Sequence, residues 1–333
     1  MAKKYLVTGG TGFIGAALII RLLKEGHEVV CLDNNSRGAS RRLGAYQKDF
    51  RFIEADIRDS DAVIVASKGM DSLLHLAFVN GTEFFYNKPE TVLDVGVRGM
   101  INVLDACRIQ GVPELVLASS SEVYQSPAIV PTDEAVPLSI PDVLNPRYSY
   151  AGGKLISELM AINYGRTEFN RVIIFRPHNV YGPDMGWEHV LPQFVLRIID
   201  LISSQPSGTL QFRVQGDGNQ TRAFVHINDF IEGVNTILLR GEHLNIYHIG
   251  SPEEISIRDV AFRVARYFGR EIELIHGPEA RGGTTRRCPD ISKLRSLGFE
   301  PRISFDEGLG TLVRWYSDNI SLRPAIKVGT HLI

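Results

Sequence analysis

A tyrosine and a lysine four residues apart, Tyr150 and Lys154, have the types and spacing for acid–base chemistry. On a helix, side chains at this spacing lie on one face about one turn apart. The phenol of tyrosine has a pKa of about 10, so little phenolate is present to act as a base at neutral pH. An ammonium group beside the phenol lowers this pKa and favours the phenolate. The pair therefore predicts a general base, Tyr150, that Lys154 activates to remove a proton from a hydroxyl group.

Hydroxyl groups and a carboxylate are grouped where the apolar run from Glu114 to Ala118 opens onto Ser119, Ser120, Ser121 and Glu122. If this run is a parallel strand, its carboxyl end lies at the sheet edge where ligands of open α/β sheets bind. We therefore expect these side chains at a ligand-binding edge.

A glycine-rich turn follows the first apolar run and leads into a helical pattern: Thr8-Gly9-Gly10-Thr11-Gly12-Phe13-Ile14-Gly15. Because glycine has no Cβ, Gly9 permits a tight turn, Gly12 the close approach of a phosphate, and Gly15 the packing of helix on strand. A phosphate there also meets the positive end of the helix dipole. The turn predicts a site for the pyrophosphate of a dinucleotide.

A carboxylate, Asp33, ends the next apolar run about twenty residues after the glycines, the usual spacing for a residue that contacts the ribose. It accepts hydrogen bonds from the adenosine ribose hydroxyls and repels a 2′-phosphate, which predicts NAD rather than NADP. Arg37 lies near enough in sequence to pair a 2′-phosphate, so NADP stays open as the alternative.

Apolar runs alternate with helical patterns through the first half of the chain, which predicts a Rossmann-type α/β fold with a doubly wound parallel sheet. Helices are expected over Ala16–Lys24 and Thr91–Gln110, with another beginning near Tyr148. The expected strands are Lys4–Val7, Glu28–Leu32, Phe50–Ile53, Ser72–Leu76, Glu114–Ser119 and Val172–Phe175.

Beyond Pro177 the chain is punctuated by proline and glycine, with short apolar runs between them. This texture predicts a dinucleotide-binding domain over residues 1–177 and a smaller, interleaved α/β lobe over 178–333. Segments near 220–250 are expected to return to the first domain.

Composition excludes several classes of protein. A net charge of −2 with 22% charged residues gives no basic field for nucleic acid or an acidic membrane. No apolar stretch is long enough to cross a bilayer, and the N-terminus does not read as a signal peptide. Three distant cysteines and scattered histidines predict neither disulfides nor a metal site, so we expect a cytoplasmic protein.

Taken together, these motifs resemble the extended short-chain dehydrogenase/reductase family, in particular its nucleotide-sugar epimerases, dehydratases and decarboxylases. The resemblance covers nearly the whole chain. Besides the motifs above, it rests on three further segments: Arg176-Pro177-His178-Asn179-Val180-Tyr181-Gly182-Pro183, the run from Gly216 to Val225, and Arg287-Cys288-Pro289-Asp290-Ile291.

The resemblance implies a role for each matching residue. Tyr150 is the base, Lys154 holds the nicotinamide ribose, Ser120 bonds the sugar C4 oxygen, and Glu122 matches an acid/base of some dehydratases and decarboxylases. Ser121, Asn179, Arg222 and Arg287 join Ser120 at the nucleotide-diphosphate sugar. The NAD site is implied to comprise Gly9, Gly12, Phe13, Ile14, Gly15, Asp33, Asn34, Asp56, Ile57, Leu76, Ala77, Tyr150, Lys154 and Pro177.

Four positions depart from the family pattern, one of them Gln125, which replaces the Gly that is common after Val-Tyr. Gly96 stands where the family usually has Asn, and Met100 where it has Thr, which removes a polar contact beside the cofactor cleft. Asp184 stands where several uronate-handling relatives have Arg, which argues against a carboxylated sugar.

Three outcomes are open for a 4-keto sugar intermediate formed with NAD. We place 4-epimerisation first, because Ser120 is typical of epimerases; 4,6-dehydration second, because of Glu122; and uronate decarboxylation third. A keto-reductase that releases its cofactor and a non-catalytic NAD(P)-sensing module are the alternatives of other classes. The resemblance also implies a homodimer built on the two helices at Thr91–Gln110 and Tyr150.

Overall fold

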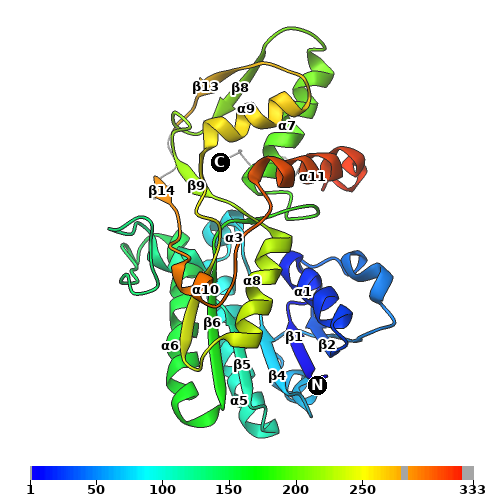
Figure 1. Ribbon diagram of the computed structural model, residues 1–333, viewed down its shortest axis with the longest axis vertical. Coiled ribbons are helices and arrows are strands. Elements are labelled where there is room, and N and C mark those ends of the chain that lie inside the picture. Colours follow the sequence, from blue (N-terminus) through cyan, green and yellow to red (C-terminus); the bar gives the residue numbers. More distant parts are fainter. Residues whose placement is uncertain (1, 279–283, 325–333) are drawn as a thin grey trace.

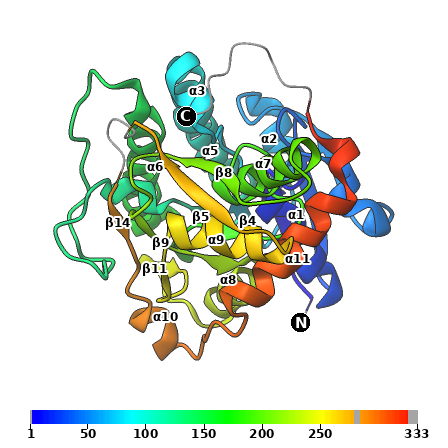
Figure 2. The same ribbon diagram turned by 90° about the horizontal axis from the view of Figure 1, so that it is seen from above.

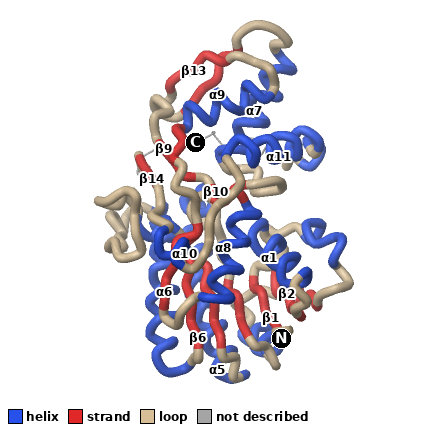
Figure 3. The backbone as a smooth tube through the Cα atoms, in the orientation of Figure 1, coloured by secondary structure: helices blue, strands red, loops and turns tan. Residues whose placement is uncertain are grey.

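The computed structural model of the protein describes residues 2–278 and 284–324. Its centre is a seven-stranded, all-parallel sheet in the order β11-β6-β5-β4-β1-β2-β3, drawn as arrows in Figure 1 and as red tubes in Figure 3. This confirms the predicted fold class. The strands are β1 (Lys4–Thr8), β2 (Glu28–Asp33), β3 (Arg51–Glu54), β4 (Ser72–His75), β5 (Glu114–Ala118), β6 (Arg171–Pro177) and β11 (Asn245–Ile249).

The direction of winding reverses between β1 and β4. After β1 the chain builds β2 and β3 on one side, and then returns to place β4, β5 and β6 on the other. In open α/β sheets, ligands bind outside the carboxyl ends of the strands at such a reversal. The glycine-rich turn, the loop after His75 and the serines after Ala118 all lie along this edge.

Helices cover both faces of the sheet. Helix α1 (Phe13–Lys24) packs beside α8 (Ile227–Arg240) over one buried apolar cluster. The second cluster lies on the other face, under α2 (Ser60–Ser67), α5 (Gly99–Gln110) and α6 (Ser149–Glu168). Burial on both faces explains why β1, β4 and β5 read as continuous apolar runs and not as alternating ones.

The predicted helix at 91–110 is a composite. It begins as α4 (Pro89–Leu93), widens to a π-helical turn, η2 (Asp94–Arg98), and continues as α5, which ends at Gly111 with φ of 67°. The glycine supplies the left-handed conformation that closes the helix. The π turn contains Gly96, the position that departs from the family pattern. A short helix, α3 (Thr82–Asn87), precedes this composite helix.

The chain beyond β6 contributes to both parts of the molecule. β11 pairs with β6 in the central sheet, and α10 (Ser292–Ser296) packs against β11. The other elements form a lobe with its own apolar core, above the carboxyl ends of the strands (Figures 1 and 2). They are β7 (Val180–Tyr181), α7 (Val190–Ser204), β8 (Leu210–Val214), β9 (Thr221–Ala223), β10 (Val225–His226), β12 (Glu254–Ser256), α9 (Ile257–Tyr267), β13 (Ile272–His276), β14 (Arg286–Arg287) and α11 (Phe305–Asp318).

Short 3₁₀ turns complete the fold at η1 (Ser40–Tyr46), η3 (Ser121–Tyr124), η4 (Pro146–Tyr148) and η5 (Ile320–Leu322). None of the described helices has the length and apolar character needed to cross a membrane. Cys31, Cys107 and Cys288 are buried free thiols.

Candidate active site

The glycine-rich turn leaves the N-terminus of α1 open. Gly9 has φ of 73°, and a Cβ there would come within 2.7 Å of the Ala77 nitrogen. Gly12 caps α1 without any side-chain hydrogen bond to the first turn. A Cβ on Gly15 would collide with the backbone of Gly9 and Gly10, so this glycine permits close packing, as predicted. Unsatisfied N–H groups at a helix start, with little steric cover, fit a pyrophosphate.

Asp33 ties this turn to the end of β2. Its Oδ2 accepts from the Thr11 nitrogen at 3.0 Å and its Oδ1 from the Asn35 nitrogen at 2.8 Å. A carboxylate offers about four lone-pair sites, so both oxygens keep the capacity to accept from ribose hydroxyls. The nearly buried Asp33 therefore fits the NAD ribose while also fixing the loop.

Two predicted adenine-side residues have structural partners as well. Asp56 accepts from Asn34 Nδ2 at 2.9 Å and from Arg58, whose hydrogen bonds lower the pKa of Asp56 to about 2. The Ile57 side chain is buried in the cluster under α5, where Gly99 leaves room for it. Asp56 therefore stays at the surface as a carboxylate, whereas the Ile57 side chain serves the core.

The loop after β4 is held by a threonine and a histidine. Thr8 Oγ1 lies 2.8 Å from His75 Nδ1 and accepts from the nitrogens of Leu76 and Ala77. Burial lowers the pKa of His75 to about 3, so the ring is neutral at physiological pH. His75 therefore positions the backbone beside the glycine turn.

The predicted catalytic side chains converge at the carboxyl end of β5. Tyr150 and Lys154 lie one turn apart on α6 and are 7% and 3% exposed, and Ser120, 8% exposed, follows β5. Burial raises the pKa of Tyr150, and a hydrogen bond with Ser120 opposes that rise. Burial also lowers the pKa of Lys154 to about 7, while its Nζ donates to the Ala118 carbonyl at 2.6 Å.

A buried network of ion pairs and hydrogen bonds links α6 to the ends of β5 and β6. Arg176 donates to both carboxylate oxygens of Glu158, at 2.9 Å and 2.6 Å, and Glu158 also bonds the Ser119 hydroxyl. Arg176 reaches Tyr124, whose hydroxyl lies 2.6 Å from His248 Nε2. The network fixes α6 against β5 and β6, which places Lys154 in register with Ala118.

Glu122 lies within a group of arginines. Arg287 Nη1 donates to Glu122 Oε1 at 2.6 Å. Although burial alone favours the neutral acid, Arg287, Arg147 and Arg222 hold the pKa of Glu122 below its usual value. Glu122 is therefore a carboxylate at neutral pH.

Arg222 and Arg287 are neighbours on the parallel strands β9 and β14. Burial and the charge of Arg287 lower the pKa of Arg222 to about 10, because cations repel one another there. The Arg287 Nε is buried without a partner among the described residues. Converging guanidinium groups with spare donors are suited to a diphosphate.

Three further predicted residues line this region. Asn179, with φ of 42°, donates from Nδ2 to the Ala223 carbonyl and so links β6 to β9. Pro177 ends β6 opposite Ile249, and Ser121 is buried at the start of η3. Asn179 reaches its place through strained backbone, which is common at functional sites.

Sequence reasoning missed Arg147 and Phe78. Arg147 lies on η4, three residues before Tyr150, and its buried Nε has no partner among the described residues. Phe78 packs edge-on against Tyr150, with ring centroids 5.1 Å apart. The position of Arg147 three residues before Tyr150 is a sequence signal that could have placed it near the site. No sequence motif distinguishes Phe78.

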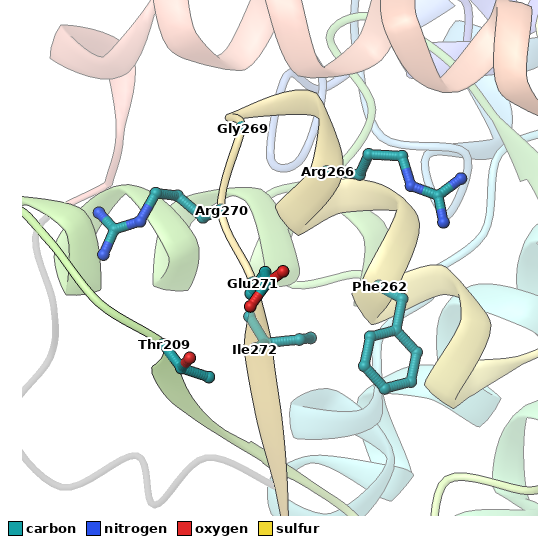
Figure 4. A pocket seen from close by; sticks show the side chains of 7 residues that line it. All are labelled: Thr209, Phe262, Arg266, Gly269, Arg270, Glu271 and Ile272. Carbon is teal, nitrogen blue, oxygen red and sulfur yellow. The ribbon is translucent and has the colours of Figure 1, made fainter.

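A separate surface hollow between α9 and β13, drawn in Figure 4, lies at the far end of the lobe from the glycine turn (Figure 1). It is lined by Thr209, Phe262, Arg266, Gly269, Arg270, Glu271 and Ile272. None of these residues belongs to the arrangement around Tyr150.

Residues 2–278 and 284–324 hold no group of three or more His, Cys, Asp or Glu side chains placed to bind a metal ion.

Comparison with known proteins places this geometry among relatives. A family model described as the NAD dependent epimerase/dehydratase family matches residues 5–250. UDP-glucuronic acid decarboxylase 1 of Xenopus tropicalis is 30% identical over 319 residues, 94% of this chain and 72% of its own. A putative UDP-glucose 4-epimerase of Methanocaldococcus jannaschii is 30% identical over 316 residues, 94% of this chain and 98% of its own.

A solved structure shows the same fold. A double mutant of DesIV, a dTDP-glucose 4,6-dehydratase from Streptomyces venezuelae with NAD bound, superposes with a TM-score of 0.84. It is 30% identical, and the match covers 95% of this chain and 98% of that one. Three different activities thus occur among relatives at equal identity, so identity alone does not choose between them.

Proposed function

Because the chain belongs to the NAD dependent epimerase/dehydratase family, we propose that it is an NAD-dependent enzyme that modifies a nucleotide-diphosphate sugar through a 4-keto intermediate. The observation that carries this proposal is the convergence of Tyr150, Lys154 and Ser120 at the carboxyl end of β5, with Arg222 and Arg287 around Glu122 of the next turn. We propose residues 178–333 as the predominantly sugar-nucleotide-binding lobe.

The chain's own residues supply the acid–base chemistry. Tyr150 removes the proton of the sugar C4 hydroxyl, and Ser120 holds that oxygen beside the phenol. Lys154 stabilises the phenolate and, with the open start of α1 and Asp33, holds the dinucleotide. Bound NAD would supply the hydride chemistry, as acceptor of the C4 hydride and as its later donor.

The fate of the keto sugar selects the reaction, and we place 4-epimerisation first. The Glu122 carboxylate is paired with Arg287, which lowers its pKa and so weakens it as the base that dehydration needs. Asp184 stands where uronate-handling relatives carry an arginine, and it accepts hydrogen bonds from Arg41 and Arg42 of η1. This position therefore offers no cation to a sugar carboxylate, which disfavours decarboxylation.

Dehydration is the second candidate, and the Glu122 charge favours it. A carboxylate kept ionised beside the sugar site can remove the C5 proton, which the C4 ketone acidifies, and water then leaves from C6. The two reactions differ in product mass.

The test is incubation with NAD and a panel of UDP-, dTDP-, GDP- and CDP-sugars, followed by mass spectrometry and NMR. Unchanged mass with altered ring couplings identifies epimerisation, whereas loss of water or of carbon dioxide identifies the rivals. Failure to convert any sugar, with NAD bound, would favour a non-catalytic NAD-sensing module. Steady accumulation of free NADH would identify an enzyme that releases its cofactor, namely a keto-reductase working in reverse.

Assembly and compartment are proposed on further grounds. Exposed apolar side chains on α5 (Ile101, Ile109) and α6 (Ile156, Leu159) support a homodimer through these two helices. Three buried free thiols support the reducing cytoplasm.

A further inference from the structure

Phe78, three residues after the end of β4, fills a slot between the π turn η2 and α6. A Cβ on Gly96 of η2 would overlap the Cζ of the Phe78 ring, and a Cβ on Gly153 of α6 would come within 2.9 Å of the same atom. The ring fits because both helices carry glycine where they face it. The slot and the ring therefore depend on each other.

The same ring contacts both members of the proposed catalytic pair. Lys154 Nζ lies 4.1 Å from the Phe78 ring centroid, within the range of a cation–π contact. The Tyr150 ring meets the Phe78 ring edge-on at an interplanar angle of 81°, and Phe85 stacks on Tyr150. Tyr150 is thus held between two aromatic rings, and the ammonium rests on one of them.

We infer that Phe78 is a positioning residue for the Lys154–Tyr150 pair, and that its aromatic face replaces the polar side chain that Gly96 lacks. The inference rests on the proposed function, in which Tyr150 is the base. A desolvated ammonium regains from the ring face part of the stabilisation that it has lost from water. The ring face thereby favours the charged form of Lys154, whose Nζ lies 5.9 Å from the Tyr150 ring centroid.

The charged and titratable groups near Lys154 are few. Glu158, one turn along α6, favours the charged amine, whereas burial lowers the pKa of Lys154 to about 7. His75 at the end of β4 is neutral, and the negative charge of Glu122 on η3 raises the pKa of Tyr150. On η2, Asp94 pairs with Arg98 at 2.8 Å and with Arg58 at 3.0 Å, and these side chains are at least one-third exposed.

The first test titrates Lys154 directly, by NMR of ¹³C-lysine in the cofactor-free protein, with Lys154→Arg to assign the signal. Phe78→Leu keeps apolar volume but removes the ring face, so the Lys154 midpoint should fall by about one pH unit. Difluorophenylalanine at position 78 keeps the shape and weakens the face, and it should give a smaller fall. Unchanged midpoints in both proteins would overturn the inference.

This titration needs neither sugar nor NAD. A failure of the proposed function would leave its result intact, and a failure of the inference would leave turnover by the wild-type protein intact. Where turnover is measurable, the alkaline limb of the kcat profile should move to lower pH in Phe78→Leu, because the uncharged amine no longer supports the phenolate.

The second test examines the shared slot. Gly96→Asn and Phe78→Ala should each reduce turnover, and the double variant should recover to within about threefold of wild type, because the amide then occupies the space of the ring. If Gly96→Asn alone fails to fold, recovery of folded protein in the double variant is the same result, read by thermal unfolding. Additive losses would contradict a common slot.

Discussion

At the scale of single residues, the proposed base is a tyrosine, whose phenol stays protonated in water at neutral pH. Burial raises the pKa of Tyr150, so the phenolate forms only with help from Ser120 and from the Lys154 ammonium. The two helpers come from different elements, the end of β5 and the next turn of α6. Catalysis therefore requires the fold, although the pair is visible in the sequence.

Replacing Tyr150 by Phe should lower turnover of the nucleotide sugar by about 10²–10⁴-fold, the usual contribution of a general base. NAD affinity should change little, because the ring and its packing on Phe85 remain. Discontinuous assays of product formation measure turnover, and isothermal titration calorimetry measures NAD affinity. Tyr164→Phe, on the same helix but away from the site, is the matched control, and equal turnover in both variants would remove Tyr150 from its role.

Glu122→Gln should tighten UDP binding by about tenfold or more, because a carboxylate beside a bound diphosphate repels it and competes for Arg287. Turnover should survive if the reaction is epimerisation and should fall by about 10²–10⁴-fold if Glu122 removes the C5 proton. Glu254→Gln, which releases the adjacent and exposed Arg286, is the control. Weaker UDP binding by Glu122→Gln would argue against Arg287 as a diphosphate ligand.

At the scale of elements, the segment after β2 joins the dinucleotide site to the lobe. Arg42 of η1 donates to the Thr11 carbonyl in the glycine turn at 3.1 Å and to the Asp184 carbonyl after β7 at 2.8 Å. Arg37 pairs with Glu188 of the same lobe loop. Hydrogen bonds through Arg42 therefore connect the turn that would hold the pyrophosphate to the lobe.

Arg42→Ala should weaken NAD binding by about tenfold or more, because it removes several charge-assisted hydrogen bonds that fix the glycine turn. Its neighbour Arg41 shares the Asp184 partner but is 42% exposed. Exposed pairs contribute little, so Arg41→Ala should change the Kd by less than about fivefold. Equal effects in the two variants would show that η1 does not brace the turn.

The elements themselves were largely predictable, because a strand buried on both faces leaves a plain apolar run. The strands from β1 to β6 lie within a few residues of the expected ranges, and the glycine turn and Asp33 lie where their motifs predict. The π turn at Gly96 was not predictable, since it accommodates the ring of Phe78, which lies on a distant loop. The Glu122–Arg287 pair joins residues 165 positions apart and has no local signal.

At the scale of the whole molecule, α5 and α6 present apolar side chains to solvent on one side of the sheet. Ile101, Ile109, Ile156 and Leu159 are 42%, 64%, 38% and 56% exposed. Burial of such a surface against a second copy stabilises a dimer through the hydrophobic effect. The same helix α6 carries Tyr150 near its start, so the proposed interface and the proposed base share an element.

Leu159→Glu should convert the protein to a monomer in sedimentation experiments at micromolar concentration, because the charge would be buried at the proposed interface. Leu239→Glu, on α8 and 70% exposed, introduces the same charge elsewhere and should leave the dimer intact. A wild-type protein that sediments as a monomer would contradict the homodimer.

The central claim is that Tyr150 and Lys154 open a cycle in which hydride leaves the sugar C4 carbon and comes back to the same sugar. The most direct measurement uses the converted nucleotide sugar carrying deuterium at C4, with the product examined by mass spectrometry and NMR. We predict that the deuterium stays in the product, at C4 after epimerisation or at C6 after dehydration, with no reduced cofactor accumulating in solution. Deuterium appearing in free NADH, or lost to water, would contradict it.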